Sequence, residues 1–199
     1  MLKDVREKEV DAGAEDVFAA VSRVGGERGW PSFMWAWKIR GRLDRLVGGV
    51  GLRRGRRDPE RLRVGDALDL WRVEELTRGG PGQDWVLRLR AEMKVPGQAW
   101  LEFRIRDRSE EGTSSSTMVQ RALFAPRGVA GRLYWLMFLP IHPFIFSSQI
   151  DAIAKDAEEL ARSDREAEVT SSGVLSVRPE DPGGGRPERD DPQPARTAG

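Results

Sequence analysis

His142 is the only histidine among the 199 residues, and its side chain could act as a general base near neutral pH. A serine hydrolase would need a hydroxyl group aligned with it. The serines cluster at 114–116 and 147–148, and the chain contains no G-x-S-x-G motif. Because His142 lies between two prolines in an apolar segment, a capping or packing role explains it more simply, and we assign no catalytic residue.

No metal or cofactor site is expected. One histidine cannot form a histidine-based metal site, and the absence of cysteine excludes zinc–thiolate sites, disulfides and cysteine nucleophiles. The acids Asp151, Asp156, Glu158 and Glu159 have the spacing of a solvated helix face rather than of a loop that binds a hard cation. No G-x-G-x-x-G motif follows an N-terminal strand, so a dinucleotide site is not predicted either.

Two carboxylates, Glu92 and Glu102, fall on neighbouring predicted strands beside Arg88, Arg90 and Arg104. Paired acids of a glycosidase would have to face a cleft. Ion pairing across the outer face of a sheet is the simpler interpretation.

The net charge of +1 conceals a basic region between Lys38 and Arg72, which includes the Arg-rich segment 53–63. That region could bind phosphate, an anionic headgroup or an acidic partner, or it could be a solvated loop. Nucleic-acid binding would need aromatic residues interleaved with the cations, or a helix that reads bases. The segment contains neither, so no nucleic-acid partner is expected.

Alternation of apolar and polar residues predicts antiparallel strands at 4–10, 85–93, 99–105 and 113–124. A further strand at 67–76 shifts its alternation between Leu70 and Trp71, which predicts a bulge there. Short connections between these strands indicate an antiparallel meander with one buried face.

Helical periodicity appears in three places. A first helix follows Asp11, a candidate N-cap, and a second spans about 34–47. A long apolar stripe from 129 to 163 predicts a C-terminal helix, which Pro140 and Pro143 must kink or interrupt. From about Glu166 the chain is rich in Pro, Gly, Asp and Ser, so we predict an ordered domain at 1–165 and a disordered tail at 166–199.

A curved sheet wrapped around a kinked helix leaves room for a cavity lined by apolar side chains. Gln120 is a polar group in an otherwise apolar row; a ligand hydrogen bond would explain it, as would a barrel end open to water. The residues expected to line a ligand cavity are Leu87, Leu89, Met93, Phe103, Met118, Gln120, Tyr134, Met137 and His142.

The predicted order of strand, two helices, antiparallel strands and long helix resembles the helix-grip fold of the START, polyketide cyclase and birch-pollen-allergen-like superfamily. Segments such as V-G-D-A-L-D-L-W-R-V-E, R-A-E-M-K-V-P-G-Q-A-W-L-E-F and F-A-P-R-G-V-A-G-R-L-Y-W-L-M-F-L-P-I-H are similar to an uncharacterised bacterial family, domain of unknown function 2867. The resemblance covers about Val5 to Glu159. It implies an α+β helix-grip fold and, because relatives are often fused to an NAD(P)-binding domain of the short-chain-dehydrogenase type, an oxidoreductase partner.

Three functions follow as hypotheses. The first is a protein, not an enzyme by itself, that binds a small hydrophobic or amphipathic ligand such as a lipid, isoprenoid or polyketide-like molecule. The second is a cyclase or aromatase in which Tyr134, His142 or Gln120 would orient and protonate the substrate. The third is a protein-interaction module with a filled core. The volume of the cavity distinguishes these hypotheses, because a filled core would favour the third and an open cavity the first two.

The most apolar stretch, Leu133 to Phe146, is shorter than the ~20 residues that cross a bilayer. We therefore expect no transmembrane segment, while peripheral membrane contact stays open. The charged N-terminal sequence lacks the apolar run of a signal peptide, so a cytoplasmic location is expected.

Overall fold

The computed structural model describes residues 1–25, 29–30, 39, 41–42, 44–46, 48–49, 56–58, 61–80, 82–110 and 112–175, with side chains as far as residue 170. Its elements, in chain order, are β1 (Leu2–Val10), α1 (Ala14–Ser22), β2 (Ala67–Leu68), β3 (Trp71–Thr77), β4 (Trp85–Ala91), β5 (Gly97–Asp107), β6 (Ser116–Pro126), α3 (Gly128–Phe138) and α4 (His142–Leu175).

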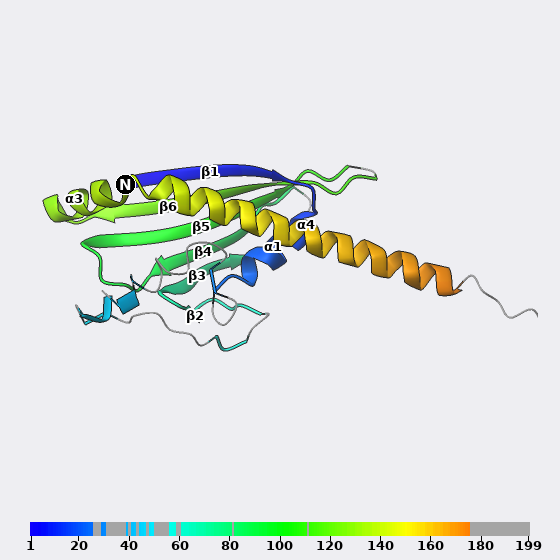
Figure 1. The fold of residues 1–199 in the computed structure, drawn as a ribbon, viewed down its shortest axis with the longest axis horizontal. Helices are drawn as coiled ribbons and strands as arrows, with labels where there is room; N and C mark the ends of the chain where they lie inside the picture. Colours follow the sequence, from blue (N-terminus) through cyan, green and yellow to red (C-terminus); the bar gives the residue numbers. More distant parts are fainter. Residues whose placement is uncertain are drawn as a thin grey trace, which may run out of the picture.

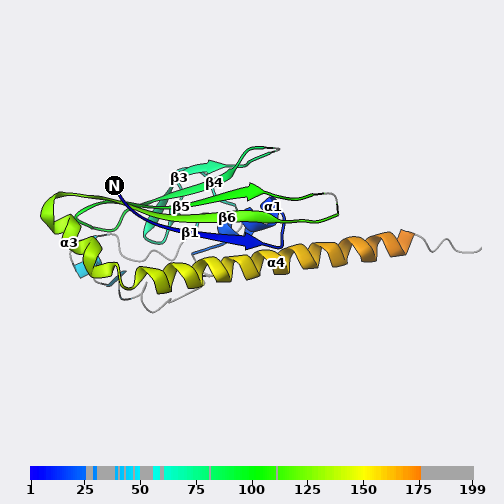
Figure 2. The same cartoon turned by 90° about the horizontal axis from the view of Figure 1, so that it is seen from above.

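The strands form one antiparallel sheet in the order β1-β6-β5-β4-β3-β2. The first strand pairs with the last, so both ends of the strand region meet at one side of the sheet. Helices α1 and α4 lie on the same face of this curved sheet, and α4 runs along it and beyond its edge (Figures 1 and 2). This is the predicted α+β helix-grip architecture.

The alternation that predicted the strands also predicted which side chains are buried. Leu87 and Leu89 of β4 pair with Phe103 and Leu101 of β5, and all four side chains are buried. Opposite them lie the apolar faces of α1 and α4, which bury residues at helical spacing, namely Val17, Phe18, Val21, Ile150, Ile153 and Ala157. The core therefore fills the space between the sheet and these two helices.

The region 67–76 differs from its prediction. It consists of two strands, β2 and β3, joined by a tight turn at Asp69 and Leu70, rather than one strand with a bulge between Leu70 and Trp71. Asp69 has a φ of 54°, a conformation that Asp tolerates better than most side chains. The indole N–H of Trp30 donates a hydrogen bond to its carboxylate at 2.9 Å. A contact with a residue so distant in sequence cannot be read from local alternation.

Helix α1 forms where the periodicity predicted it, with the acids Glu15 and Asp16 in its first turn. Its N-cap is Gly13, without a side-chain hydrogen bond, so the candidate cap Asp11 is wrong. The second predicted helix, 34–47, lies largely outside the described residues. The positions described within it, among them Ile39 and 44–46, are helical.

The predicted interruption of the C-terminal helix is confirmed. Helix α3 ends at Phe138, α4 begins at His142, and the two axes differ by 63°. Pro140 and Pro143 lie at this break, where each lacks the N–H that a continuous helix would need.

Helix α4 ends later than expected. It continues to Leu175 rather than stopping near 163, so the first part of the predicted tail is helical. The sequence D-R-E-A-E there is made mostly of good helix formers, and this local propensity was overlooked. Residues 176–199, the rest of the predicted disordered tail, lie outside the described residues.

Candidate functional site

The nine predicted cavity residues separate into three groups. Leu87, Leu89, Phe103 and Met118 are fully buried and belong to the packed core, and Met93 is half-buried against it. Their inward orientation agrees with the prediction. Their part in binding a ligand stays a prediction.

Gln120 and His142 form the second group, on the inner surfaces of β6 and α4. The amide Nε2 of Gln120 donates a hydrogen bond to Oε1 of Gln149 at 3.1 Å, and both side chains are 1% exposed. Within the described residues, Gln120 Oε1 and Gln149 Nε2 are buried without a partner. Exchanging the O and N positions of both amides would still leave one acceptor and one donor unused. The core therefore contains two polar groups that could bind a further polar group.

These glutamines belong to a band of polar side chains beneath α4, which we call the polar strip: Asp4, Arg6, Gln120, His142 and Gln149. The alternating side chains Asp4 and Arg6 of β1 are half-buried and form an ion pair at 3.0 Å. Arg6 pairs in register with Gln120 of the neighbouring strand. The weak alternation of β1 predicted a strand but did not show that its inner face carries charged side chains.

His142 packs edge-on against Trp135, with ring centroids 4.7 Å apart, and against Phe146 at 5.1 Å. Burial lowers the pKa of His142 below its ordinary value of 6.5, a shift that the Asp4 carboxylate opposes and Arg6 reinforces. The neutral imidazole is thus favoured. Its Nδ1 atom is buried without a partner among the described residues.

Tyr134 and Met137 form the third group, on α3. Tyr134 packs on Phe124 and Phe138, with ring centroids 5.7 Å and 4.8 Å away. Met137 points outward and is 64% exposed. In this conformation Met137 is therefore separated from the buried residues with which it was grouped.

Glu92 and Glu102 both form ion pairs, as predicted, but of the three arginines expected beside them only Arg104 takes part, while Arg88 and Arg90 lie near Glu74. Glu92 accepts two hydrogen bonds from Arg72, at 2.6 and 3.1 Å, and the buried Glu102 pairs with Arg104 and Arg121 at 2.8 and 3.3 Å. Both acids are held by guanidinium groups and face no cleft in the described part of the chain. Among those residues no group of three potential metal ligands occurs.

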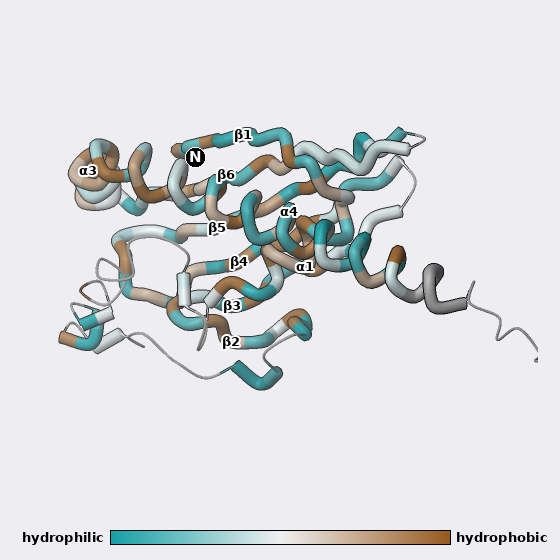
Figure 3. The backbone as a smooth tube through the Cα atoms, turned by 45° about the vertical axis from the view of Figure 1, so that its right-hand side comes forward, coloured by the Kyte–Doolittle hydropathy of each residue, from teal (hydrophilic) through white to brown (hydrophobic). Residues whose placement is uncertain are grey.

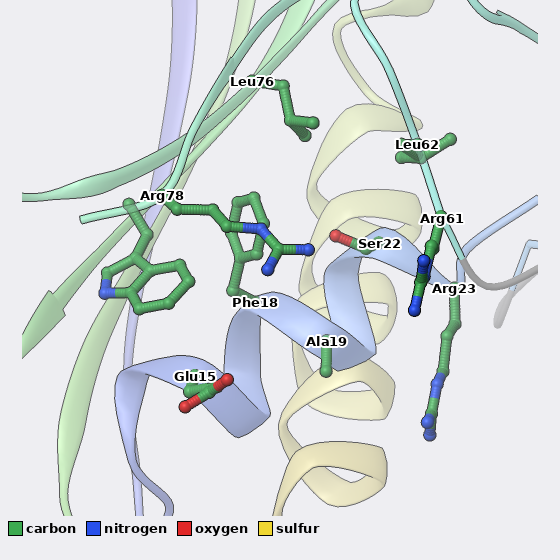
Figure 4. Close-up of a pocket in the computed structure, with 10 residues that line it drawn as sticks. Glu15, Phe18, Ala19, Ser22, Arg23, Arg61, Leu62, Leu76 and Arg78 are labelled. Carbon is green, nitrogen blue, oxygen red and sulfur yellow. The ribbon is translucent and has the colours of Figure 1, made fainter. Parts of the chain in front are cut away.

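A pocket of about 220 Å³ lies elsewhere, between α1, the strands β3 and β4, and residues 61–62 (Figure 4). None of the nine predicted residues lines it. The lining comprises Glu15, Phe18, Ala19, Ser22, Arg23, Arg61, Leu62, Leu76, Arg78 and Trp85.

The pocket combines an apolar floor with a basic rim. Phe18 and Trp85 contact each other, with ring centroids 5.1 Å apart, and Leu62 and Leu76 add aliphatic surface. Arg23, Arg61 and Arg78 contribute three guanidinium groups, against one carboxylate from Glu15. None of the three arginine side chains forms an ion pair with a residue in the described ranges. Among the described residues the pocket thus presents an excess of positive charge beside an aromatic surface.

Part of the Arg-rich segment helps to build this region. Arg56 donates a hydrogen bond to the carbonyl oxygen of Ser22 at 2.9 Å, at the C-terminal end of α1. Arg57 forms a double hydrogen bond with Asp66, which holds the pKa of that carboxyl below its usual range. These contacts fix the chain just before Arg61. Of the three arginines in the pocket, only Arg61 belongs to the Arg-rich segment 53–63, for which anion binding was one of the open alternatives.

Comparison with solved structures gives only distant similarity. Truncated norcoclaurine synthase from Thalictrum flavum is 14% identical, with a TM-score of 0.41 over 77% of this chain and 92% of that one. A conserved protein from Geobacillus kaustophilus is 16% identical, with a TM-score of 0.37 over 79% and 96%. The di-domain ARO/CYC protein BexL of the BE-7585A biosynthetic pathway is 13% identical, with a TM-score of 0.36 over 80% and 50%. Similarity at this level carries no argument about activity.

No protein of curated function matches this chain in sequence. The family match covers β1 to the first part of α4, which includes every pocket residue and the whole polar strip. On this match over residues 1–149, the chain belongs to the family described as "Protein of unknown function (DUF2867)".

Proposed function

We propose that this protein binds a small amphipathic molecule that has an apolar body and an anionic head. The observation that carries the proposal is the pocket beside α1, where aromatic and aliphatic side chains lie next to three arginines without ion-pair partners in the described residues. Ligand sites in proteins typically combine such apolar walls with a few polar groups that orient the ligand.

The size of the pocket restricts what it can hold. Its volume of about 220 Å³ is below the ~300–1,000 Å³ of sites that enclose a drug-sized molecule. A single ring or a medium-length acyl chain would fit, with the rest of a longer ligand outside. Phe18 and Trp85 would contact the apolar part.

The rim selects the head group. Arg78 extends over the pocket, and Arg23 and Arg61 lie close together at its other side (Figure 4). A carboxylate or phosphate would accept hydrogen bonds from these planar guanidinium groups, for which such oxygen pairs are well suited. An uncharged alcohol of the same chain length would gain only the apolar contacts.

The binding role fits a carrier better than an enzyme acting alone. The family resemblance described from the sequence implies an association with an NAD(P)-binding domain of the short-chain-dehydrogenase type. We therefore propose that the ligand is passed to, or received from, a separate NAD(P)-dependent oxidoreductase. The nine residues predicted from the sequence remain candidates for contacts with the far end of a longer ligand.

Titration calorimetry with decanoate and 1-decanol tests this proposal. Decanoate should bind more tightly than decanol, and Arg78→Gln should weaken decanoate binding about two- to fivefold while leaving decanol unchanged. Arg108→Gln, which removes an exposed arginine outside the pocket, is the matched control. Equal affinity for the two probes, or no binding of either, would refute the proposal and favour an interaction module with a filled core.

A second candidate is a cyclase-type enzyme that uses the polar strip. It is favoured by the neutral imidazole of His142 and by the unused polar atoms of Gln120 and Gln149. Native mass spectrometry of molecules that co-purify with wild-type protein and with His142→Phe separates the candidates. An enzyme would accumulate a different, unconverted molecule in the variant, whereas a carrier would retain the same one.

A further inference from the structure

The bend between α3 and α4 carries an exposed apolar surface, which we call the elbow: residues 128–144. Its α3 part exposes Val129, Leu133, Leu136 and Met137 to between 59% and 72%. These positions are spaced by four, three and one residues, so they share one face of the helix. Leu139, Ile141 and Phe144 extend the surface across the bend to the start of α4.

The opposite face of α3 is already used. Gly131 lies so close to the sheet that an added Cβ would be 2.4 Å from the carbonyl oxygen of Pro96. Trp135, four residues later, is buried and stacks on Phe124 with ring centroids 5.8 Å apart. Since these contacts fix the rotation of α3, its outward face cannot turn inward to hide its leucines. Figure 3 shows the strong hydrophobicity along α3 at one end of the molecule.

The charge distribution along the chain is equally one-sided. No Asp or Glu occurs between Gly112 and Ile150, and two exposed arginines, Arg127 and Arg132, flank the apolar face of α3. From residue 151 to residue 168, α4 carries seven acids against three cations. The apolar, basic elbow and the acidic end of α4 therefore lie at different positions along the chain, and α4, which rises about 1.5 Å per residue, holds them apart.

We propose that the elbow inserts into the surface of a bilayer that contains anionic lipids. An apolar helix face flanked by arginines is the arrangement that holds an interfacial helix ~5–10 Å deep, with the cations at the headgroups. Arg127 and Arg132 would contact lipid phosphate, and the acidic end of α4 would point away from the membrane. A soluble acidic partner would match the arginines but would leave the continuous apolar face uncovered.

The bend argues for surface insertion rather than crossing. Among the described residues no single helix is long and apolar enough to span a bilayer, although α3 and α4 to Thr170 pass that test as a pair bent by 63°. From Ile150 onward the large apolar side chains of α4 are packed against the core, apart from the single exposed Val169 in its acidic end, so among the described residues of α3 and α4 the elbow offers the continuous apolar surface.

Co-sedimentation with vesicles tests the proposal directly. Wild-type protein should bind phosphatidylcholine vesicles that contain phosphatidylglycerol, and much less those of phosphatidylcholine alone. Leu133→Ser/Met137→Ser should reduce the partition coefficient about tenfold, because it removes apolar area that enters the bilayer. Arg127→Gln/Arg132→Gln should abolish the preference for anionic lipid. Val169→Ser, an equally exposed apolar residue at the acidic end of α4, is the control and should change nothing.

Failure to bind anionic vesicles, or equal binding by wild type and the Leu133/Met137 variant, would overturn the proposal. Sedimentation velocity provides the competing outcome: a wild-type dimer that the Leu133/Met137 variant loses, without vesicle binding, would assign the elbow to a second copy of the chain. Decanoate binding at the pocket is independent of these substitutions, so this test can fail while the proposed function stands.

Discussion

Gln120 and Gln149 join the middle of β6 to the inner face of α4 through one hydrogen bond of 3.1 Å, in surroundings from which water is almost excluded. An amide pair in such a place costs free energy unless its remaining polar atoms are also satisfied. The pair is therefore a polar contact between the sheet and α4, within a core that is otherwise mostly apolar.

The first prediction concerns this pair. Gln120→Leu should lower the free energy of unfolding by about 1–3 kcal/mol, because Gln149 is left buried without its partner. The double variant Gln120→Leu/Gln149→Leu should recover most of that loss, as measured by urea unfolding. If the pair also recognises a ligand, Gln120→Leu will alter selectivity across a lipid panel. Unchanged selectivity would count against Gln120 as a recognition group.

The second prediction concerns pH. Since burial holds the pKa of folded His142 below its unfolded value of 6.5, the unfolded state binds the proton more readily. The stability that the neutral imidazole contributes is complete above pH 6.5 and is lost as the pH falls through that value toward the folded pKa. Between pH 7.5 and pH 5.5 the urea midpoint of wild-type protein should therefore fall more than that of His142→Phe. Parallel declines would show that another group is responsible.

The sequence predicted the parts of the fold that depend on local pattern. The alternation at 85–93 and 99–105 gave β4 and β5 with their buried faces, and the two prolines gave the break before α4. The turn at Asp69 was missed because its stabilising partner, Trp30, is distant in the chain. The alternation of neighbouring residues predicts a structure only where contacts between residues close in the sequence determine it.

The pocket shows the same limit more strongly. Phe18 lies in the predicted first helix and Trp85 in the predicted strand 85–93, yet only tertiary packing brings the two together beside Arg78. Gln120, by contrast, could be singled out because a polar residue interrupted an apolar row. The sequence pattern thus identified Gln120, a polar residue in an apolar row, but it did not predict the pocket, because none of the residues that line the pocket interrupts a pattern.

The third prediction concerns the docking of α3. Replacing a helical glycine by alanine ordinarily stabilises a protein by ~0.5–1 kcal/mol. Gly131→Ala should do the opposite, because its Cβ would meet the Pro96 carbonyl oxygen at 2.4 Å and Pro126 at 2.8 Å. A lower thermal midpoint, with more rapid proteolysis within α3, is expected. A raised midpoint would show that α3 can move away from the sheet without cost.

The most direct test of the central claim is to close the pocket. Ala19 lines it from α1, and Ala19→Trp should fill much of its volume of about 220 Å³. Ala167→Trp, on the exposed surface of α4, adds the same side chain elsewhere and serves as the control. We predict that Ala19→Trp loses decanoate binding in titration calorimetry while its circular dichroism and that of the control stay native. Decanoate binding that survives in a folded Ala19→Trp protein would contradict the account and place the ligand elsewhere.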